Sequence, residues 1–457
     1  MLRNRWRMTA VVLGVLGVWL LLLAGQAQAV PSFARQTGMD CTACHTVFPE
    51  LTPFGRTFKL TGYTLSKKSD KPYEFPPPIS AAFLASFTNL AKPLPQGGLA
   101  PNGSSRNDNV NVPQEMSLFY AGRIVPYVGA FVQGTYDGVS TQFLLDHADV
   151  RFAYPTKLWS KSLVLGITMN NAPTAQDVLN TVPAWGFPWA ASSVSLTPAA
   201  AAVIDGGLDQ QVGGFGGYFY WNNLLYGELT FYRTTRTGFT QFLGAGTVTE
   251  TVVDQVVPYW RVFLQHQWKQ HSFALGTFGL AARIFPPDQS RGPTDHFTDV
   301  AVDAQYQFLG KKHLFTAQTL WIHEFQHLGA SFGQKVSANR NDRLDTYRVN
   351  LNYYYRSPWG TLGGTAAYFT TWGTRDTGLY APSPGGGSRA GYPNSNGFIV
   401  EGSYLPWKYT KITVQYTIYN KFNGAETGYD GTPTTGVPHP RNARENNTLY
   451  ILIWQMI

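Results

Sequence analysis

The feature of this sequence that most constrains its fold is the alternation of apolar and polar residues within short segments. Residues 347–356 read YRVNLNYYYR, so every second position from Tyr347 is apolar or aromatic, while Arg348 and Asn350 stand between them. Residues 411–419 alternate in the same way. Successive side chains of a β-strand point to opposite faces, so this period of two predicts strands with one apolar and one polar face.

Similar segments recur along most of the chain. With the two above they number 16: 79–91, 115–125, 127–137, 142–154, 162–170, 213–222, 224–234, 257–268, 272–284, 297–308, 313–326, 347–356, 361–373, 397–405, 411–419 and 447–457. Tight turns such as 357–360 and 310–312 alternate with longer polar stretches such as 92–114, 376–396 and 423–446. Short turns at one end and long loops at the other are typical of outer-membrane barrels.

Composition separates a membrane barrel from most soluble folds. Charged residues make up 14% of the chain, against about 25% in ordinary soluble domains, and aromatic residues make up 15%. A sheet in lipid must close on itself, because an open edge would leave backbone groups unsatisfied. We therefore predict an all-β fold, in which residues 79–457 form a barrel of about 16 antiparallel strands in the outer membrane of a Gram-negative bacterium. A soluble β-sandwich, whose apolar faces would meet each other, is the alternative.

The first 29 residues have the pattern of a secretory signal peptide. Arg3, Arg5 and Arg7 precede an apolar run at 11–23, and small residues at 27–29 offer a cleavage site. A retained membrane anchor is the alternative, but the run is short for a membrane span. Loss of the three arginines lowers the formal charge from +8 to +5. This balance is too mild to predict a nucleic-acid partner.

The only two cysteines fall in residues 41–45, CTACH. This spacing indicates one covalently attached haem c, because Cys41 and Cys44 can form thioethers with the two porphyrin vinyl groups and His45 can bind the iron as the proximal ligand. A thioredoxin-like redox pair would need a βαβ context, and a zinc site would need a second pair of ligands. A structural disulfide across two residues would be strained, although export leads to a compartment where disulfides form.

The predicted haem-bearing segment, residues 30–73, is too short to bury much of a core alone, so a porphyrin would supply a large share of it. A charged and then proline-rich stretch follows, and its residues 74–78 are the predicted linker to the barrel. The aromatic residues expected to pack on the porphyrin are Phe33, Phe48, Phe54, Phe58 and Tyr63. Arg56 and Lys59, together with Arg35, are candidates to neutralise the propionates, although solvated surface charges would look the same.

Residues 323–327, HEFQH, match the HExxH pattern of zinc peptidases. That chemistry needs both histidines on one face of a helix, one turn apart. Here the surrounding residues predict a strand, in which His323 and His327 would lie about 13 Å apart and could not share one zinc ion. We instead expect these side chains near the end of a barrel strand.

The run SFARQTGMDCTACHTVFPELTPFGRTFKLTGY, followed by a barrel, resembles the fused cytochrome–porin family of outer-membrane monohaem cytochromes, best known as oxidases of extracellular Fe(II). The likeness continues at 167–189, 211–233, 258–279 and 446–454 and so spans nearly the whole mature chain. The resemblance implies a small haem domain in or below a barrel of about 16 strands. It also implies that electrons pass from an extracellular donor such as Fe(II) to a periplasmic carrier.

The sixth ligand of the haem iron decides whether such a protein is an oxidase or a relay. An open position would make it an enzyme that binds its donor, and a filled one would make it an electron-transfer protein. Met39 lies only two residues before Cys41 and is not expected to reach the opposite face of the porphyrin. The remaining candidates are Met116, Met169, His147 and His439.

A rival function belongs to a different class. The barrel would then be a porin for small solutes, and the haem segment would be a sensor or plug without net electron flow. A general porin keeps a clear channel, whereas tyrosine and arginine on the polar faces of the strands suggest a packed interior.

Overall fold

The computed structural model describes residues 31–67, 76–95, 107–173, 177–183, 186–234, 251–431 and 440–457. The predicted signal peptide at 1–29 lies outside these residues. So do His439 and residues 30 and 68–75, which belong to the predicted haem-bearing segment and linker.

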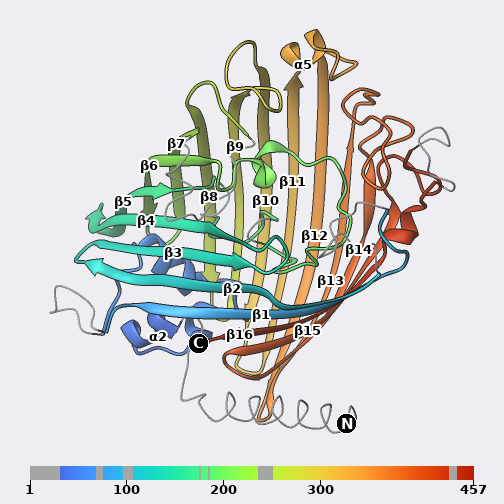
Figure 1. The fold of residues 1–457 in the computed structure, drawn as a ribbon. Coiled ribbons are helices and arrows are strands. Elements are labelled where there is room, and N and C mark those ends of the chain that lie inside the picture. Colours follow the sequence, from blue (N-terminus) through green and yellow to red (C-terminus); the bar gives the residue numbers. More distant parts are fainter. Residues whose placement is uncertain are drawn as a thin grey trace, which may run out of the picture.

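Sixteen antiparallel strands form one closed barrel, in which each strand pairs with its neighbours in sequence and β1 pairs with β16 (Figure 1). The strands are β1 Ile79–Leu90, β2 Asp108–Val125, β3 Val128–Asp137, β4 Gln142–Leu158, β5 Lys161–Asn170, β6 Val212–Trp221, β7 Leu225–Thr234, β8 Val257–Trp268, β9 His271–Ile284, β10 Asp295–Leu309, β11 His313–His327, β12 Asn341–Ser357, β13 Gly360–Gly373, β14 Ser395–Trp407, β15 Thr410–Lys421 and β16 Thr448–Met456. The predicted count of 16 is confirmed, and closure excludes the sandwich.

Two strands begin several residues earlier than the alternation predicted. β2 starts at Asp108 instead of residue 115, and β12 starts at Asn341 instead of residue 347. The additional residues are mostly polar, yet Asp108 pairs with Asn89 of β1 and Asp342 pairs with Gln326 of β11. Backbone hydrogen bonds between strands do not depend on apolar side chains, so a strand can continue where the hydrophobic pattern has ended.

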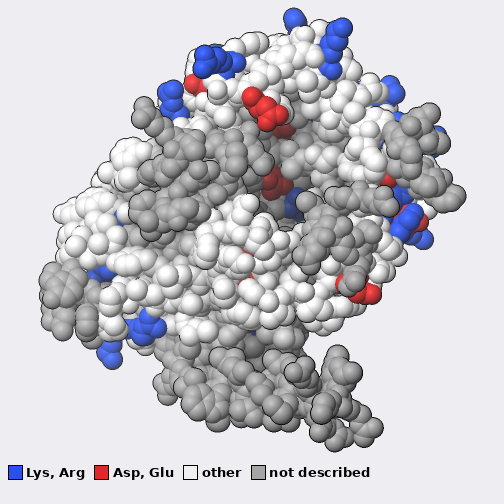
Figure 2. Space-filling view, in the orientation of Figure 1, with Lys and Arg blue, Asp and Glu red and all other residues white. Residues whose placement is uncertain are grey.

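The barrel is apolar on its outer face, and its inner face carries polar side chains together with apolar ones that pack on the chain inside the barrel. In β5, Leu165, Ile167 and Met169 point outward and are 47%, 40% and 55% exposed, whereas Thr168 and Asn170 between them are buried. On the face drawn in Figure 2, charged side chains gather toward the ends of the barrel and leave a broad uncharged surface over the strands. This is the reverse of a water-soluble sheet, which hides its apolar face.

The two ends of the barrel differ as predicted. Short turns such as 310–312 join β10 to β11 and 358–359 join β12 to β13 at one end, and β1 begins and β16 finishes at that same end. The other end carries the long connections, including α5 (Gly329–Gly333) and the 3₁₀ helix η5 (Ala443–Asn446). Within the described residues, no helix is long and apolar enough to cross a membrane.

Residues 31–67, here called the plug, form three short helices, α2 (Pro31–Thr37), α3 (Cys41–Cys44) and α4 (Pro53–Leu60). They lie inside the barrel, near the end with the short turns (Figure 1). Helix α4 begins where the Thr52 hydroxyl accepts a hydrogen bond from the Gly55 amide, with Pro53 in the first turn. Both residues are favoured at helix starts.

The last strand, β16, is apolar on both faces, which is unusual for a strand with a watery interior. Its inner face explains the pattern, because Tyr450, Leu452 and Met456 are buried in one cluster with Val47 and Phe48 of the plug. The Phe48 ring also meets Trp454 edge-on, with 5.4 Å between ring centroids. An apolar outer surface on one side and the plug on the other account for the apolar residues on both faces of β16.

Candidate cofactor site

Cys41, Cys44 and His45 lie on and just after the short helix α3, at the edge of the plug. Helix α3 is closed by a hydrogen bond from the His45 amide to the Cys41 carbonyl, at 2.9 Å. The Gly55 backbone of α4 packs against the Cys44 carbonyl so closely that an added Cβ would stand 2.2 Å from that oxygen. The three side chains therefore share a rigid, tightly packed support.

The His45 ring is held in the tautomer that an iron ligand needs. Its Nδ1 lies 3.2 Å from the Pro49 carbonyl oxygen, and because a carbonyl can only accept, Nδ1 must carry the proton. Nε2 is then the nitrogen with the available lone pair. Burial lowers the pKa of His45 to about 4, so the ring is neutral at physiological pH. A backbone carbonyl behind the second ring nitrogen is the usual support of a metal-binding histidine.

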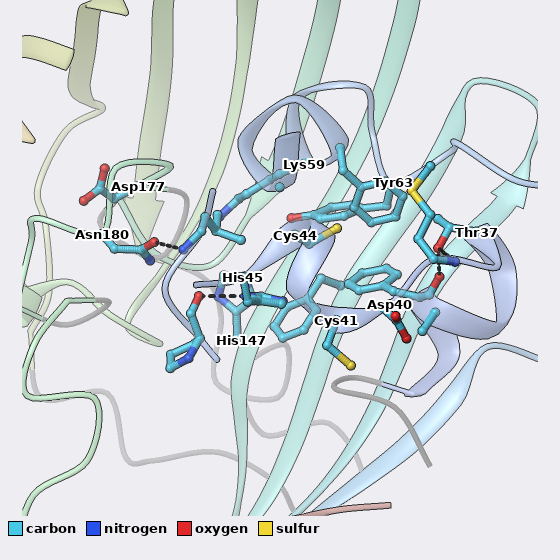
Figure 3. A pocket seen from close by; sticks show the side chains of 18 residues that line it. Thr37, Asp40, Cys41, Cys44, His45, Lys59, Tyr63, His147, Asp177 and Asn180 are labelled. Atoms are coloured by element: carbon cyan, nitrogen blue, oxygen red, sulfur yellow. Dashed lines mark hydrogen bonds between the residues drawn. The ribbon is translucent and has the colours of Figure 1, made fainter. Parts of the chain in front are cut away.

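A cavity of about 900 Å³ opens beside these three residues (Figure 3). The lining is mainly apolar and consists of Phe33, Ala34, Thr37, Met39, Asp40, Cys41, Cys44, His45, Pro49, Leu51, Gly55, Phe58, Lys59, Tyr63, Phe131, His147, Asp177 and Asn180. The donor set of two cysteine thiols and one imidazole, together with the aromatic lining, fits a covalently attached haem.

Three of the five aromatic residues predicted to pack on a porphyrin line this cavity, namely Phe33, Phe58 and Tyr63. Phe33 and Tyr63 are stacked, with 5.5 Å between ring centroids. Phe48 lines a neighbouring cavity instead. Phe54 lines neither of these two cavities, although it lies in the same helix as Phe58.

The environment of the thiols distinguishes a tether from a redox pair. Cys41 and Cys44 are not joined in a disulfide. Burial, and then the neighbouring Cys41, raise the pKa of Cys44 to about 11. Redox-active Cys-X-X-Cys pairs have lowered pKa values that favour the reactive thiolate. The site therefore lacks the electrostatics of a thioredoxin-like pair.

The structure brings Lys59, but not Arg56 or Arg35, to the cavity. Burial, and then Arg151, lower the pKa of Lys59 to about 8. Arg35 donates to the Ile79 carbonyl at 2.5 Å. Arg56 is fully buried and points into the barrel wall, where its guanidinium donates to Gln265, Gln305, Gln307 and Ser272 at 2.6–3.3 Å.

Arg56 and Glu50 anchor the plug to the inner face of the wall. Glu50 is fully buried and accepts hydrogen bonds from Thr316 of β11 and, at 2.9 Å, from Asn352 of β12. On the opposite side of the plug, Tyr63 donates to Asp149 of β4 at 2.6 Å, and Tyr218 of β6 donates to the Leu60 carbonyl at 2.9 Å. Sequence reasoning did not single out Glu50, because an isolated glutamate gives no sign of its partners.

The connection between β5 and β6, described at residues 171–173, 177–183 and 186–211 and here called the inner loop, folds into the lumen beside the plug. Asp177 pairs with Arg261 of β8 at 3.2 Å, and Asn180 accepts a hydrogen bond from the Leu51 amide of the plug at 2.9 Å. Farther along, the short helix η2 (Val203–Gly207) carries two amides that donate to Glu324 and Asp299 of the wall, each at 2.6 Å. The described parts of the plug and inner loop together occupy much of the interior.

Two larger cavities continue from the candidate site. One, of about 1250 Å³, also touches His45, Pro49 and Phe131. The other, of about 1550 Å³, is lined by inner-loop residues and by β12–β16, and it meets the former at Ala191. The cavities thus adjoin one another from the plug toward residues that precede the long loops.

The HEFQH residues form no zinc site. They lie at the end of strand β11, as predicted, and Glu324 points inward while His323 and His327 bond to Asp345 and Asn341, each at 2.7 Å. Among the described residues, no group of three or more His, Cys, Asp or Glu side chains could hold a metal ion.

The candidates for the sixth iron ligand are widely separated. Met116 and Met169 are on β2 and β5 and are 44% and 55% exposed. Met169 is among the outward residues of β5, so it faces away from the plug. Met39 and His147 both line the cavity, Met39 from the plug and His147 from β4.

No known family model matches this chain, and no curated protein matches it. Among solved structures, a loop-L8 deletion variant of OmpT, an outer-membrane protein of Vibrio cholerae, has a TM-score of 0.43 and 8% identity, covering 83% of this chain and 98% of that one. An anion-selective porin from Comamonas acidovorans has a TM-score of 0.43 and 10% identity, covering 83% and 98%. The outer-membrane channel DcaP of Acinetobacter baumannii also has a TM-score of 0.43 and 10% identity, covering 83% and 96%. Similarity at this level says nothing about what this chain binds or transports.

Proposed function

We propose that this protein carries electrons across the outer membrane, from an extracellular reductant such as Fe(II) to a periplasmic electron carrier, through one haem c attached at Cys41 and Cys44. The observation that carries the proposal is the cavity beside Cys41, Cys44 and His45, which is lined by the plug, by the inner loop and by two side chains of the wall of a closed barrel. A bound haem supplies one-electron chemistry: each Fe(II) outside gives up one electron and becomes Fe(III), and the periplasmic carrier gains that electron.

The surface of the barrel supports a position in lipid. Outward residues such as Leu165, Phe215 and Leu275 are large, apolar and exposed, while the inward residues of the same strands are polar or buried against the plug and the inner loop. Water would penalise such a surface, whereas the core of a bilayer favours it. Since short turns face the periplasm in outer-membrane barrels, the plug would lie on the periplasmic side.

The filled lumen supports passage of charge over passage of solutes. Glu50 and Arg56 of the plug and Asp177 of the inner loop are fully buried among inward side chains of the wall. A general porin keeps a water-filled channel at this place. The rival reading, a solute porin with a haem sensor, has less support for this reason.

Different residues of the chain would have different roles around the cofactor. The Cys41 and Cys44 sulfurs would tether it, and His45 Nε2 would bind the iron while its Nδ1–H stays on the Pro49 carbonyl. Phe33 and Phe58 keep water from the cavity walls. Asp40, next to Cys41, pairs with Lys408 in the turn between β14 and β15. This contact holds that edge of the cavity at the end of the barrel with the short turns, where a periplasmic acceptor would approach.

The adjoining cavities support a route for a small hydrophilic donor. The larger of the two is lined by residues near the long loops and shares Ala191 with the other, and that other cavity reaches His45. Because an extracellular ion cannot cross lipid, it must come close to the redox centre from within the barrel. A hydrated metal ion or a small complex is of the size that such cavities admit.

The test is stopped-flow haem absorbance of the purified full-length protein after addition of Fe(II). Reduction of the haem, with stoichiometric formation of Fe(III), is the expected result. The same preparation should show little ion conductance in a planar bilayer. A haem that stays oxidised with Fe(II) and with other extracellular reductants, in a protein that conducts ions freely, would favour the porin instead.

A further inference from the structure

The described barrel wall contributes two side chains to the cofactor cavity, Phe131 of β3 and His147 of β4. His147 is 1% exposed, and its ring lies against Phe131 with 5.2 Å between ring centroids. Phe131 in turn stacks on Phe33 of the plug at 6.2 Å. His147 thus faces the cavity from the wall, whereas His45 faces it from the plug (Figure 3).

A break in the strand register brings His147 to the inside. His147 pairs with Gln133, but Leu145, two residues earlier, pairs with the adjacent Gly134, so β4 holds one extra residue here. In a regular strand His147 would share a face with Phe143, which is 60% exposed on the outside. The bulge reverses that phase, so residues 147, 149 and 151 all point inward and are buried. Bulges commonly re-aim a side chain beside a functional site.

The bulge is supported by its own hydrogen bonds. The Asn171 side chain accepts from the Ala148 amide at 2.8 Å and donates to the Leu145 carbonyl at 3.2 Å, which spans the extra residue. Gln210 of the inner loop donates to Asp146 at 2.8 Å. Three polar contacts on one irregularity hold the His147 side chain in a fixed direction.

We propose that His147 is the sixth ligand of the haem iron. The inference rests on the proposed function, because it assumes the covalent haem at Cys41 and Cys44. The haem would then be bound by two histidines, one from the plug and one from the barrel wall.

Two other cavity residues are competitors. Met39 is 43% exposed and lies on the Cys41 side of the plug, two residues from the tether. Lys59 is on α4, in the same small segment as His45. Met39 and Lys59 both belong to the plug, as His45 does, whereas His147 reaches the cavity from β4 of the wall.

A filled sixth position has a consequence for the reaction. The iron would have no vacant site for a donor, so electrons would pass from Fe(II) to the haem without a bond between the donor and the haem iron. The protein would be a relay and not an oxidase that binds its substrate at the iron. Ligation by His147 would also cross-link the plug to β4.

The experiment combines electron paramagnetic resonance and near-infrared magnetic circular dichroism of the oxidised, full-length protein. The expected signature of the unmodified protein is a low-spin haem with two histidine ligands. His147→Ala should lose this signal in favour of a high-spin one, and added imidazole should restore it. His147→Met should stay low-spin but acquire the near-infrared band of methionine ligation. His266→Ala, an exposed histidine on β8, is the matched control and should leave the signal unchanged.

The possible failures are distinguishable. Covalent haem, measured as the pyridine haemochrome of denatured protein, should be equal in all of these variants. Its absence from the unmodified protein would refute the proposed function itself. A methionine or lysine signature in the unmodified protein, or an unchanged low-spin signal in His147→Ala, would refute the role of His147 alone. If His147→Ala does not fold, the signature of the unmodified protein and of His147→Met still decides.

Discussion

At the scale of single residues, Gly55 shows how closely the supports of the candidate site are packed. An added Cβ would lie 2.2 Å from the Cys44 carbonyl oxygen and 3.0 Å from its carbonyl carbon, and both are backbone atoms that cannot move aside cheaply. The sequence gives no sign of this requirement, because glycine is found in many local conformations. Only the packing of α4 on α3 reveals it.

Gly55→Ala should therefore displace α3 from α4. We expect a loss of stability of about 1–3 kcal/mol, typical of overpacking, and a reduced yield of covalent haem. Thermal unfolding and haem content per protein would measure both. Gly402→Ala is the control, since nothing lies within 4 Å of the Cβ it would add. Equal haem content and stability in the two variants would contradict the packing argument.

The two cysteines carry a second prediction at this scale. Cys44→Ser removes one thioether, so we expect the denatured protein to lose its covalent haem stain. Thr42→Ser, an exposed residue between the cysteines, is the control and should keep the stain. A normal covalent haem band in Cys44→Ser would show that the attachment site lies elsewhere.

At the scale of elements, helix α4 is fastened to the wall through Arg56. Its guanidinium satisfies the side-chain oxygens of Gln265, Gln305 and Gln307, all of which are buried. The sequence suggested Arg56 as a possible propionate partner, because a cationic side chain near a haem motif often has that role. In the structure the Arg56 guanidinium donates to side chains of the wall and does not line the cavity, whereas Lys59 does.

Arg56→Met should loosen the plug without opening the barrel. Three buried amide oxygens would lose a charged donor, at a cost of about 3 kcal/mol or more. We expect faster proteolytic cleavage within residues 31–67, measured by mass spectrometry, while the barrel keeps its heat-dependent gel mobility. Arg343→Met, at an exposed position of β12, should not change the rate. An altered haem spectrum with unchanged proteolysis would instead favour a propionate contact.

At the scale of the whole molecule, the apolar outer surface of the barrel favours lipid over water as its surroundings. An outward residue near the middle of a strand, such as Leu165, should therefore tolerate charge poorly. Leu165→Arg should destabilise the barrel in phospholipid vesicles by about 2–4 kcal/mol if it lies at the bilayer midplane, and by less toward the interface. Urea unfolding into and out of vesicles measures this cost.

The control for that prediction is Ser162→Arg, in the same strand but next to the turn, where the aqueous boundary is expected. It should cost much less. Equal and small effects of the two substitutions would indicate a water-exposed surface and would contradict the position of the barrel in a membrane.

The sequence by itself determined the strands and predicted the haem motif, because both depend on residues close together in the chain. A period of two was enough to find all 16 strands, and the spacing in CTACH was enough to name Cys41, Cys44 and His45 as one site. The sequence pattern missed the first residues of β2 and β12, since backbone pairing continues there beyond the apolar pattern.

Only the tertiary structure decided which distant residues meet the motif. Glu50 and Arg56 find their partners more than 200 positions away, and His147 was one of four remaining candidates until the bulge in β4 turned it inward. The physical reason is that the phase of a strand, the closure of the barrel and the folding of the inner loop are set by long-range pairing. No local pattern records which inward side chains will surround the plug.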